Sequence, residues 1–254
     1  MKIRAIMINT FREAIRDKVL YSLLFFALLM IGGSILLGRL TIGENIKIIK
    51  DMGLASISIF GMLIAIFVGI GLVYKEIDKK TIYTVIAKPV HRYQFLLGKY
   101  LGLILTLLVE VAIMSFGLLL LVLSYEGHVE LSILKAILLI FFELMTITAV
   151  AILFSSFSTP ILSGLFTLAV YIVGHLSRDL LAFGVESESA MIKYSTAFIY
   201  YSLPNLDNFN IKGRVVHQVL VSWEHLSFAM LYGVLYISII LLLSMIIFQR
   251  RDFR

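Results

Sequence analysis

Residues 75–99, KEIDKKTIYTVIAKPVHRYQFLLGK, form a polar and strongly cationic stretch between two long apolar runs. Its basic residues are Lys75, Lys79, Lys80, Lys88, Arg92 and Lys99, and its acids are Glu76 and Asp78. Because Lys and Arg collect in cytoplasmic loops, we expect the stretch on the cytoplasmic face. Pro89 would end any short helix that begins near Glu76. A charged segment held between two spans is well placed to receive force from a soluble partner.

The composition of the chain indicates a polytopic membrane protein. Of 254 residues, 60% are hydrophobic and 15% charged, with a mean hydropathy of +1.00. Soluble domains have about half apolar residues and about a quarter charged. The net charge is +6, and the basic residues cluster beside the apolar runs. Membrane topology and anionic lipid headgroups explain this placement, so no nucleic-acid partner is expected. The absence of cysteine excludes disulfides and cysteine-based metal sites.

Six apolar runs have about the length needed to cross a bilayer. The expected spans are residues 19–37, 52–74, 100–125, 136–154, 160–176 and 226–248, of which the fifth is marginal in length. A cleaved signal peptide is the alternative for the first, but no small-x-small cleavage site follows it. The resulting fold class is all-α: a single transmembrane domain over residues 1–254 with six transmembrane helices.

Residues 1–18 are too charged to insert, yet their apolar residues recur at helical spacing, as Ile3, Met7 and Phe11 illustrate. Arg12 and Arg16 fall on the polar side. We expect an amphipathic helix in the cytoplasmic interface, with these arginines as anchors near lipid phosphates. A flexible basic leader is the alternative.

The distribution of basic residues predicts that both termini are cytoplasmic. Fourteen of the 22 Lys and Arg residues lie in the N-terminal segment, in 75–99 and at the C-terminus. The polar link 38–51 is then expected outside. Residues 177–225 mix charges with many aromatic residues, which favours helices on the outer interface over a disordered loop.

Small residues recur four apart in the second span, at Gly61, Ala65 and Gly69. Such a stripe allows two helices to approach closely in a bilayer, where packing replaces the hydrophobic drive. We therefore interpret it as a packing seam rather than a substrate groove.

Glu110 and Glu143 fall near the middle of the third and fourth spans. A charge at the bilayer centre costs about 2.5 kcal/mol or more, so each carboxyl is expected to be protonated, paired or exposed to a wet cavity. If the two helix faces meet, the pair forms one polar site that lines or braces a pathway. The alternative is that each makes a private hydrogen bond between helices. His175, near the outer end of the fifth span, is expected to be an interfacial hydrogen-bonding group rather than a metal ligand.

Sequence motifs for catalysis are missing. The chain has no GxxxxGK[ST], HExxH or GxSxG sequence, so it cannot hydrolyse ATP through a P-loop of its own. We therefore predict no catalytic residue, no metal site and no cofactor on this chain. If transport is driven by ATP, the motor is another polypeptide.

Four stretches together resemble the ABC-2 class of ABC-transporter permeases. They are NTFREAIRDKVLY (9–21), GLVYKEIDKKTIYTVIAKPVHRYQFLLGKYLG (71–102), SLPNLDNFNIK (202–212) and RRDF (250–253). The closest likeness is to the permeases of nitrous-oxide-reductase (multicopper enzyme) maturation systems. The resemblance implies a dimer of six-helix permeases in the cytoplasmic (inner) membrane, acting as an exporter.

The resemblance also implies two separate ATPase subunits, which bind ATP and Mg. The family's coupling helix maps onto residues 76–87. Its candidate contacts with the ATPase are Glu76, Asp78, Lys79, Lys80 and Thr81. The turn 155–160 is uncharged, so we expect docking to rest on the 75–99 stretch and the N-terminal helix.

A different class of function stays open: a membrane-embedded enzyme or an ATP-independent carrier that uses Glu110, Glu143 and His175. An enzyme would be expected to gather several polar groups at one depth, and the sequence places these apart. A carrier would often show an internal repeat, and none is evident.

Overall fold

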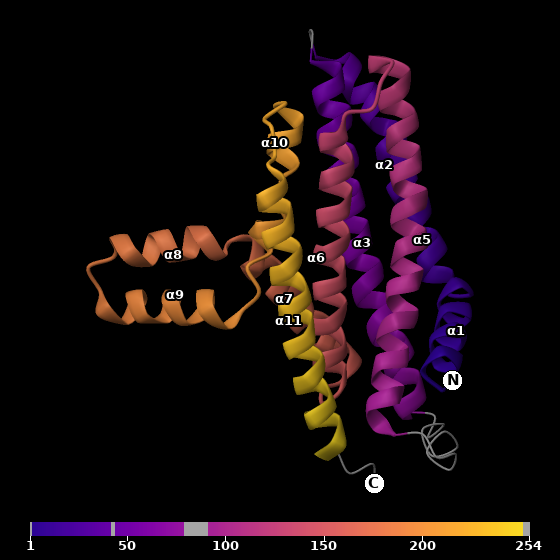
Figure 1. The fold of residues 1–254 in the computed structure, drawn as a ribbon, viewed down its shortest axis with the longest axis vertical. Coiled ribbons are helices and arrows are strands. Elements are labelled where there is room, and N and C mark those ends of the chain that lie inside the picture. Colours follow the sequence, from indigo (N-terminus) through magenta and orange to yellow (C-terminus); the bar gives the residue numbers. More distant parts are fainter. Residues whose placement is uncertain (1, 42–43, 79–90, 251–254) are drawn as a thin grey trace.

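The protein is a bundle of long helices (Figure 1). The computed structural model describes residues 2–41, 44–78 and 91–250, with 72–78 and 250 described by their helical backbone alone. The helices are α1 (Lys2–Ile15), α2 (Lys18–Arg39), α3 (Asn45–Asp78), α5 (Arg92–Glu126), α6 (Leu131–Ser155), α7 (Pro160–His175), α8 (Ser177–Glu186), α9 (Ala190–Ser202), the 3-10 helix η1 (Leu206–Phe209), α10 (Lys212–Val216) and α11 (Trp223–Arg250). The predicted all-α membrane fold is confirmed.

Within the described residues, five helices are long and apolar enough to cross a membrane: α2, α3, α5, α6 and α11. The fifth predicted span is shorter, because α7 has 16 residues and is followed by α8 after a bend of 62°. Counted as one broken span, the α7–α8 pair gives the sixth crossing. Pro160 stands at the start of α7 behind Thr159, where the missing amide hydrogen of proline costs nothing.

Several helices are longer than the predicted spans. The link between α2 and α3 is short, because α2 continues to Arg39 and α3 already begins at Asn45. At the other end, α3 continues to Asp78 and α5 begins at Arg92, so both ends of the 75–99 stretch belong to long helices. Helices can continue past the hydrocarbon when their backbone bonds are satisfied internally. The hairpin between α5 and α6 turns at Gly127, whose φ of 74° suits glycine.

The predicted N-terminal helix is present as α1, and it lies against the first half of α5 (Figure 1). Two glycines of α5 make this close packing possible. A Cβ atom at Gly98 would lie 2.7 Å from Ile6 Cβ, and one at Gly102 would lie 2.6 Å from Thr10 Cβ. Lys99 adds an ion pair, with Nζ 3.7 Å from Glu13 Oε2. Successive turns of α1 therefore follow successive turns of α5, so α1 is a fixed part of the bundle.

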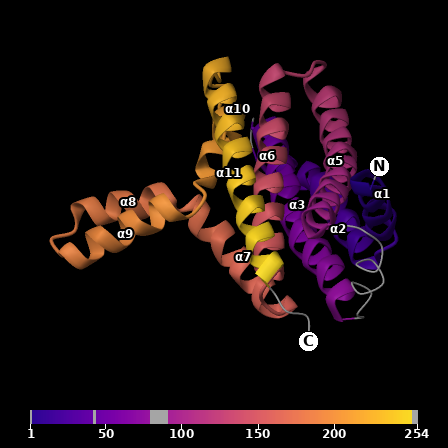
Figure 2. The same ribbon diagram turned by 60° about the horizontal axis from the view of Figure 1, so that its bottom comes forward.

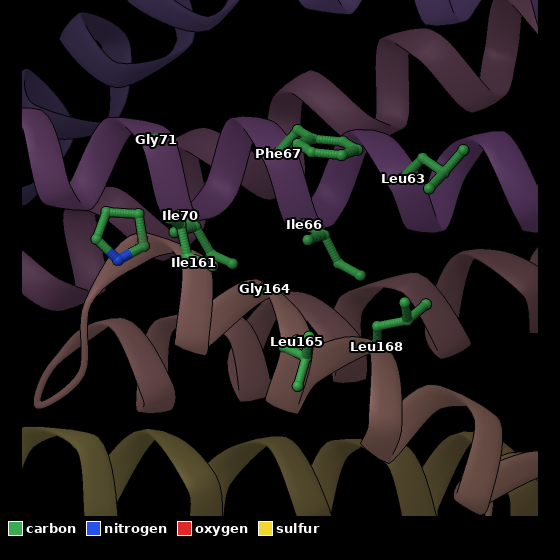
Figure 3. Close-up of a pocket in the computed structure, with 10 residues that line it drawn as sticks. Leu63, Ile66, Phe67, Ile70, Gly71, Ile161, Gly164, Leu165 and Leu168 are labelled. Atoms are coloured by element: carbon green, nitrogen blue, oxygen red, sulfur yellow. The ribbon is translucent and has the colours of Figure 1, made fainter.

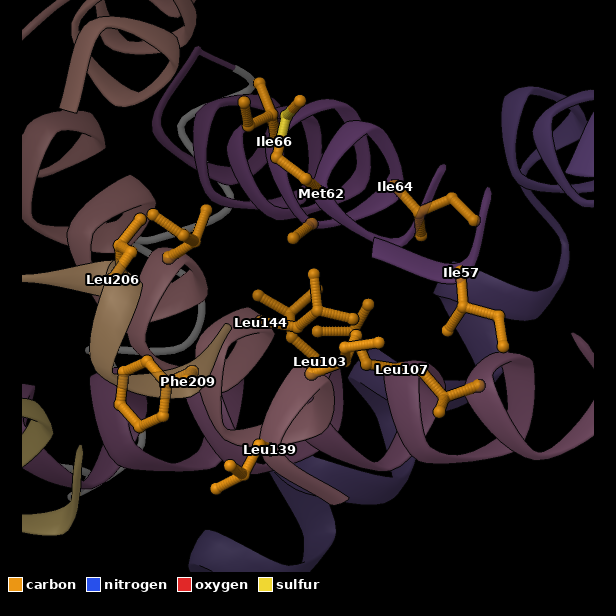
Figure 4. Packing of buried hydrophobic residues seen from close by; sticks show 14 of the residues in the cluster. Ile57, Met62, Ile64, Ile66, Leu103, Leu107, Leu139, Leu144, Leu206 and Phe209 are labelled. Carbon is orange, nitrogen blue, oxygen red and sulfur yellow. The ribbon is translucent and has the colours of Figure 1, made fainter. Parts of the chain in front are cut away.

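The small-residue stripe on α3 is a packing seam inside the chain. Gly61, Ala65 and Gly69 are all buried. A Cβ atom at Gly61 would lie 2.5 Å from Leu144 Cδ1 of α6, and Gly69 faces Leu103 of α5. Figure 4 shows the apolar side chains of α3, α5 and α6 that fill the space between these helices. The stripe is therefore used up by contacts within one copy of the protein.

The predicted outer segment 177–225 is helical but divides into two parts. The α8–α9 hairpin projects sideways from the bundle in both ribbon views (Figures 1 and 2). The following part, with η1 and α10, packs into the bundle, where Leu206, Phe209 and Val215 are fully buried. The backbone N–H of Asn205 donates to the Tyr232 hydroxyl of α11 at 2.8 Å. The second part is thus integrated into the core rather than lying on an interface.

Candidate functional site

Five polar side chains from four helices meet in what we call the polar cluster. Its members are Ser58 of α3, Glu143 of α6, Tyr171 and His175 of α7, and Lys212 of α10. Ser58 Oγ donates to Glu143 Oε1 at 3.2 Å and lies 3.1 Å from the Tyr171 hydroxyl. Lys212 Nζ donates to Ser58 Oγ at 3.2 Å. Ser58 and Glu143 are fully buried.

The hydrogen-bonding capacity of these groups fixes most proton positions. Ser58 Oγ has one proton, which goes to Glu143, so it accepts from Tyr171 and Lys212. His175 Nδ1 lies 3.1 Å from the backbone oxygen of Tyr171, which can only accept, so Nδ1 carries a proton. His175 Nε2 then faces Glu143 Oε1 at 3.5 Å. This separation is at the outer limit of a hydrogen bond, and Nε2 has no hydrogen-bond partner among the described residues.

The cluster corrects the expectation that the polar groups of the spans are isolated. His175, expected to be a hydrogen-bonding group, does form a hydrogen bond, between Nδ1 and the backbone oxygen of Tyr171, and its Nε2 also faces a buried carboxyl. Ser58, Tyr171 and Lys212 were not singled out from the sequence. The available signal was the spacing of Tyr171 and His175, which are four residues apart and therefore on one face of α7, with ring centroids 4.5 Å apart.

Glu110 lies elsewhere. The residue is part of the wall of a separate small cavity of about 160 Å³ between α1, α2 and α5. Neither carboxyl oxygen has a hydrogen-bond partner among the described residues. Glu143, by contrast, contacts Ser58 and His175. Glu110 and Glu143 therefore have different neighbours, and their contacts do not join them into the single polar site that the sequence suggested.

The predicted ATPase contacts fall largely outside what the structure describes. Glu76 and Asp78 belong to the last turn of α3 by their backbone, and their side chains lie outside the described residues, as do Lys79, Lys80 and Thr81. The neighbouring described contact is that of Arg92, whose Nη1 donates to the backbone oxygens of Phe248 and Gln249 at 3.0 and 2.9 Å. The start of α5 and the end of α11 are thus tied together.

The two predicted lipid anchors are exposed. Arg12 is on α1 and Arg16 follows its last turn, where the backbone N–H of Arg16 donates to the oxygen of Glu13 at 3.1 Å. The buried residues of α1 are Thr10 and Ala14, on the side that meets α5. Contact of the arginines with lipid phosphate stays a prediction.

A buried ion pair lies at the α5–α6 turn. Lys50 Nζ is 2.6 Å from Glu126 Oε1 and 3.3 Å from Glu130 Oε1, and the lysine side chain is 2% exposed. Glu126, His128 and Glu130 have the spacing of a metal site. The Lys50 ammonium already supplies a cation between the two glutamates, so this geometry is that of a structural clasp.

An apolar pocket of about 440 Å³ opens between α3 and α7. Figure 3 shows its walls, which come from Leu63 to Gly71 on α3 and from Pro160 to Leu168 on α7. Ile161 on its rim is 83% exposed. The lining side chains carry no polar group, so the pocket suits an acyl chain or another apolar group and offers no polar cargo a hydrogen bond.

The model of the family described as ABC-2 family transporter protein matches residues 4–253. No curated protein matches the chain. The family match covers every described helix from α2 to α11 and nearly all of α1.

Proposed function

The chain belongs to the ABC-2 family of transporter proteins, and from that premise we propose that it is the membrane subunit of a homodimeric, ATP-driven exporter. The family establishes a multi-pass permease subunit of an ABC transporter, a transport subunit that is not itself catalytic and that associates with an ABC ATPase. The observation that carries the proposal is the family match over residues 4–253 together with five or six membrane-crossing helices. Two ATPase copies per dimer would bind ATP and Mg.

We place the ATPase contact at the end of the bundle that carries the termini. Figure 1 shows the N-terminus, the C-terminal end of α11 and the first turn of α5 at one end. This placement makes that end cytoplasmic and agrees with the concentration of Lys and Arg there. The contact would use Glu76 and Asp78 at the end of α3, the residues that follow them, and α1. A push on this site reaches α3 directly.

Replacing Glu76 and Asp78 together by Lys tests this placement. We expect the double variant to insert in the membrane normally but to lose ATPase binding or to uncouple ATP hydrolysis from transport, because the contact reverses its charge. Glu44→Lys is the control, since Glu44 directly precedes the other end of α3 and pairs with Lys47. Copurification of an ATPase with Walker motifs and its activity in liposomes are the readouts. If the double variant couples ATP hydrolysis to transport as the wild type does, the ATPase does not bind at Glu76 and Asp78.

Dimerisation needs a face other than the α3 seam, which is occupied inside the chain. The exposed side of α2 offers one. Gly32 and Gly33 have no atom within 4 Å of an added Cβ, and the residues one turn away on the same face, Leu29, Leu36 and Leu37, are exposed. Small residues allow close approach between helices in lipid. Native mass spectrometry should find two copies; a stable single copy that transports cargo with its ATPase would contradict the dimer.

We also propose the inner-membrane location and the branch of the family. The four quoted stretches resemble permeases of nitrous-oxide-reductase maturation systems, and this likeness supports export of a component needed to mature a multicopper enzyme. Deletion of the gene should then leave the apo form of such an enzyme outside the membrane. If these enzymes mature fully in the deletion strain, the proposed role in multicopper enzyme maturation is wrong. The assignment as a permease would not be affected.

A further inference from the structure

A small cavity of about 160 Å³ lies where α1 ends and α2 begins, against the middle of α5. Its walls include Ile15 of α1, Leu20, Tyr21 and Leu24 of α2, and Glu110 of α5. Thr106 also lines it, but the Thr106 hydroxyl already donates to the Gly102 oxygen at 3.0 Å. The remaining side-chain polar groups on its walls are the Glu110 carboxyl, which is buried, and the hydroxyl of Tyr21, a residue that is 54% exposed.

Glu110 is buried without a partner. The residue is 2% exposed, and neither carboxyl oxygen has a hydrogen-bond partner among the described residues. Burying a carboxyl group without a hydrogen bond is costly, and burying an ionised one costs more. A ligand that donates hydrogen bonds and carries positive charge would remove this cost.

The cavity lies close to the charged end of α2 rather than at the bilayer centre. Arg16 and Lys18 are exposed, and Asp17 caps α2 by accepting from the backbone N–H of Val19 at 3.0 Å. These charges belong at the level of lipid headgroups. Leu20 and Leu24 lie two and six residues further along α2, or about 3–9 Å deeper at 1.5 Å per residue. Glu110 is thus within reach of a headgroup, although it is central in the sequence of its span.

We propose that this cavity binds the ammonium of an aminophospholipid such as phosphatidylethanolamine from the adjoining leaflet. The ammonium would donate to Glu110, the phosphate would lie at the level of Arg16 and Lys18, and the acyl chains would continue along the exposed side of α2 and α5. The cavity has the volume of about five water molecules, which suits an ammonium with its two carbons. A choline headgroup is bulkier and has no N–H to donate.

Native mass spectrometry of the full chain tests the proposal. The purified protein is mixed with dioleoyl phosphatidylethanolamine, its N-methyl and N,N-dimethyl forms, or dioleoyl phosphatidylcholine, and the bound fraction is measured. The three lipids that retain an N–H should bind, and phosphatidylcholine should bind at least about tenfold more weakly, as expected for loss of a charged hydrogen bond.

Two variants make the test specific to the cavity. Glu110→Gln removes the charge and should remove the preference for phosphatidylethanolamine, while the matched control Glu143→Gln, on the next span and outside the cavity, should keep it. Leu24→Phe fills the cavity and leaves the carboxyl in place, so it should also reduce binding, and it serves if Glu110→Gln does not fold. Equal binding of the two natural lipids, or an unchanged preference in both cavity variants, would overturn the proposal. None of these measurements needs an ATPase, so this outcome is independent of the proposed transport function.

Discussion

Gly102 is the position at which a single methyl group should lift α1 from α5. An added Cβ would lie 2.6 Å from Thr10 Cβ and 2.7 Å from the backbone oxygen of Met7. A flexible side chain could turn aside, but the Met7 oxygen belongs to the helix backbone. Gly102→Ala therefore requires that α1 moves as a unit. Gly117 on the same helix is the matched control, because its nearest atom, Leu28 Cδ2, would lie at an ordinary 3.4 Å.

The expected size of the effect follows from two opposing terms. Alanine stabilises a helix interior by about 1 kcal/mol relative to glycine, and this gain applies at both positions. Overpacking costs about 1–3 kcal/mol, and it applies at Gly102 alone. Gly102→Ala should thus be less stable than Gly117→Ala by about 1–3 kcal/mol, or at least about 2 °C in Tm for a chain of this size.

A cysteine reporter measures the movement directly. The chain has no cysteine, so Thr10→Cys introduces a single thiol at a fully buried position of α1. Maleimide should label this thiol slowly in the parent chain and in Gly117→Ala, and faster in Gly102→Ala. If α1 also carries part of the ATPase contact, coupling should fall in parallel. Equal labelling and equal Tm in both glycine variants would refute the packing of α1 on α5.

Lys50→Met should lower the free energy of unfolding by about 1–3 kcal/mol, because it leaves the partly buried Glu126, whose side chain is 13% exposed, without the cation that pairs with it; Lys47→Met, in an exposed pair, should leave Tm unchanged. If Lys50→Met changes Tm as little as Lys47→Met does, the Lys50–Glu126 ion pair is solvated and does not stabilise the fold. Glu143→Gln should assemble normally but lower transport, because an amide, which cannot transfer a proton, replaces the carboxyl that faces His175, whereas Glu143→Ala should also lower Tm. Wild-type transport by the Gln variant would make this glutamate purely structural.

The sequence predicted the membrane class and most of the helices because hydropathy over a window of about 20 residues is a strong, local signal. The sequence predicted helix boundaries less accurately where they depend on contacts between residues far apart in the chain. The helix at Asn45 starts inside a segment that looks polar, and the Lys50 contact with Glu126 that makes it favourable joins residues 76 positions apart. The bend after α7 is likewise hard to predict from sequence. A single residue separates the end of α7 at His175 from the start of α8 at Ser177, and it is neither glycine nor proline.

The polar cluster shows why site residues are harder to predict than spans. Glu143 could be flagged by its cost in a membrane, but Ser58 is an ordinary residue of an apolar helix. Lys212 comes from a segment that the sequence places outside. Only the return of α10 into the bundle brings its ammonium to Ser58. Glu110 was flagged by the same rule as Glu143, and its depth became clear only from its neighbours on α2.

The continuity of α3 suggests how movement of the ATPase at Glu76 could be transmitted to the polar cluster at Ser58. The helix runs unbroken from Asn45 to Asp78, so Glu76 and Ser58 are joined by 18 residues of rigid rod, about 27 Å at 1.5 Å per residue. Gly61 keeps this rod in close contact with Leu144 of α6.

Ser58 holds both Glu143 and Lys212 through bonds of 3.2 Å, and a hydrogen bond is lost by about 3.6 Å. We infer that a shift of α3 by less than about 1 Å is enough to break the hydrogen bond between Lys212 of α10 and Ser58. Val215 of α10 is fully buried, so Val215→Cys should be labelled faster when ATP drives the assembled complex. Labelling that ignores ATP in a complex that still transports its cargo would show that α3 does not act as this lever.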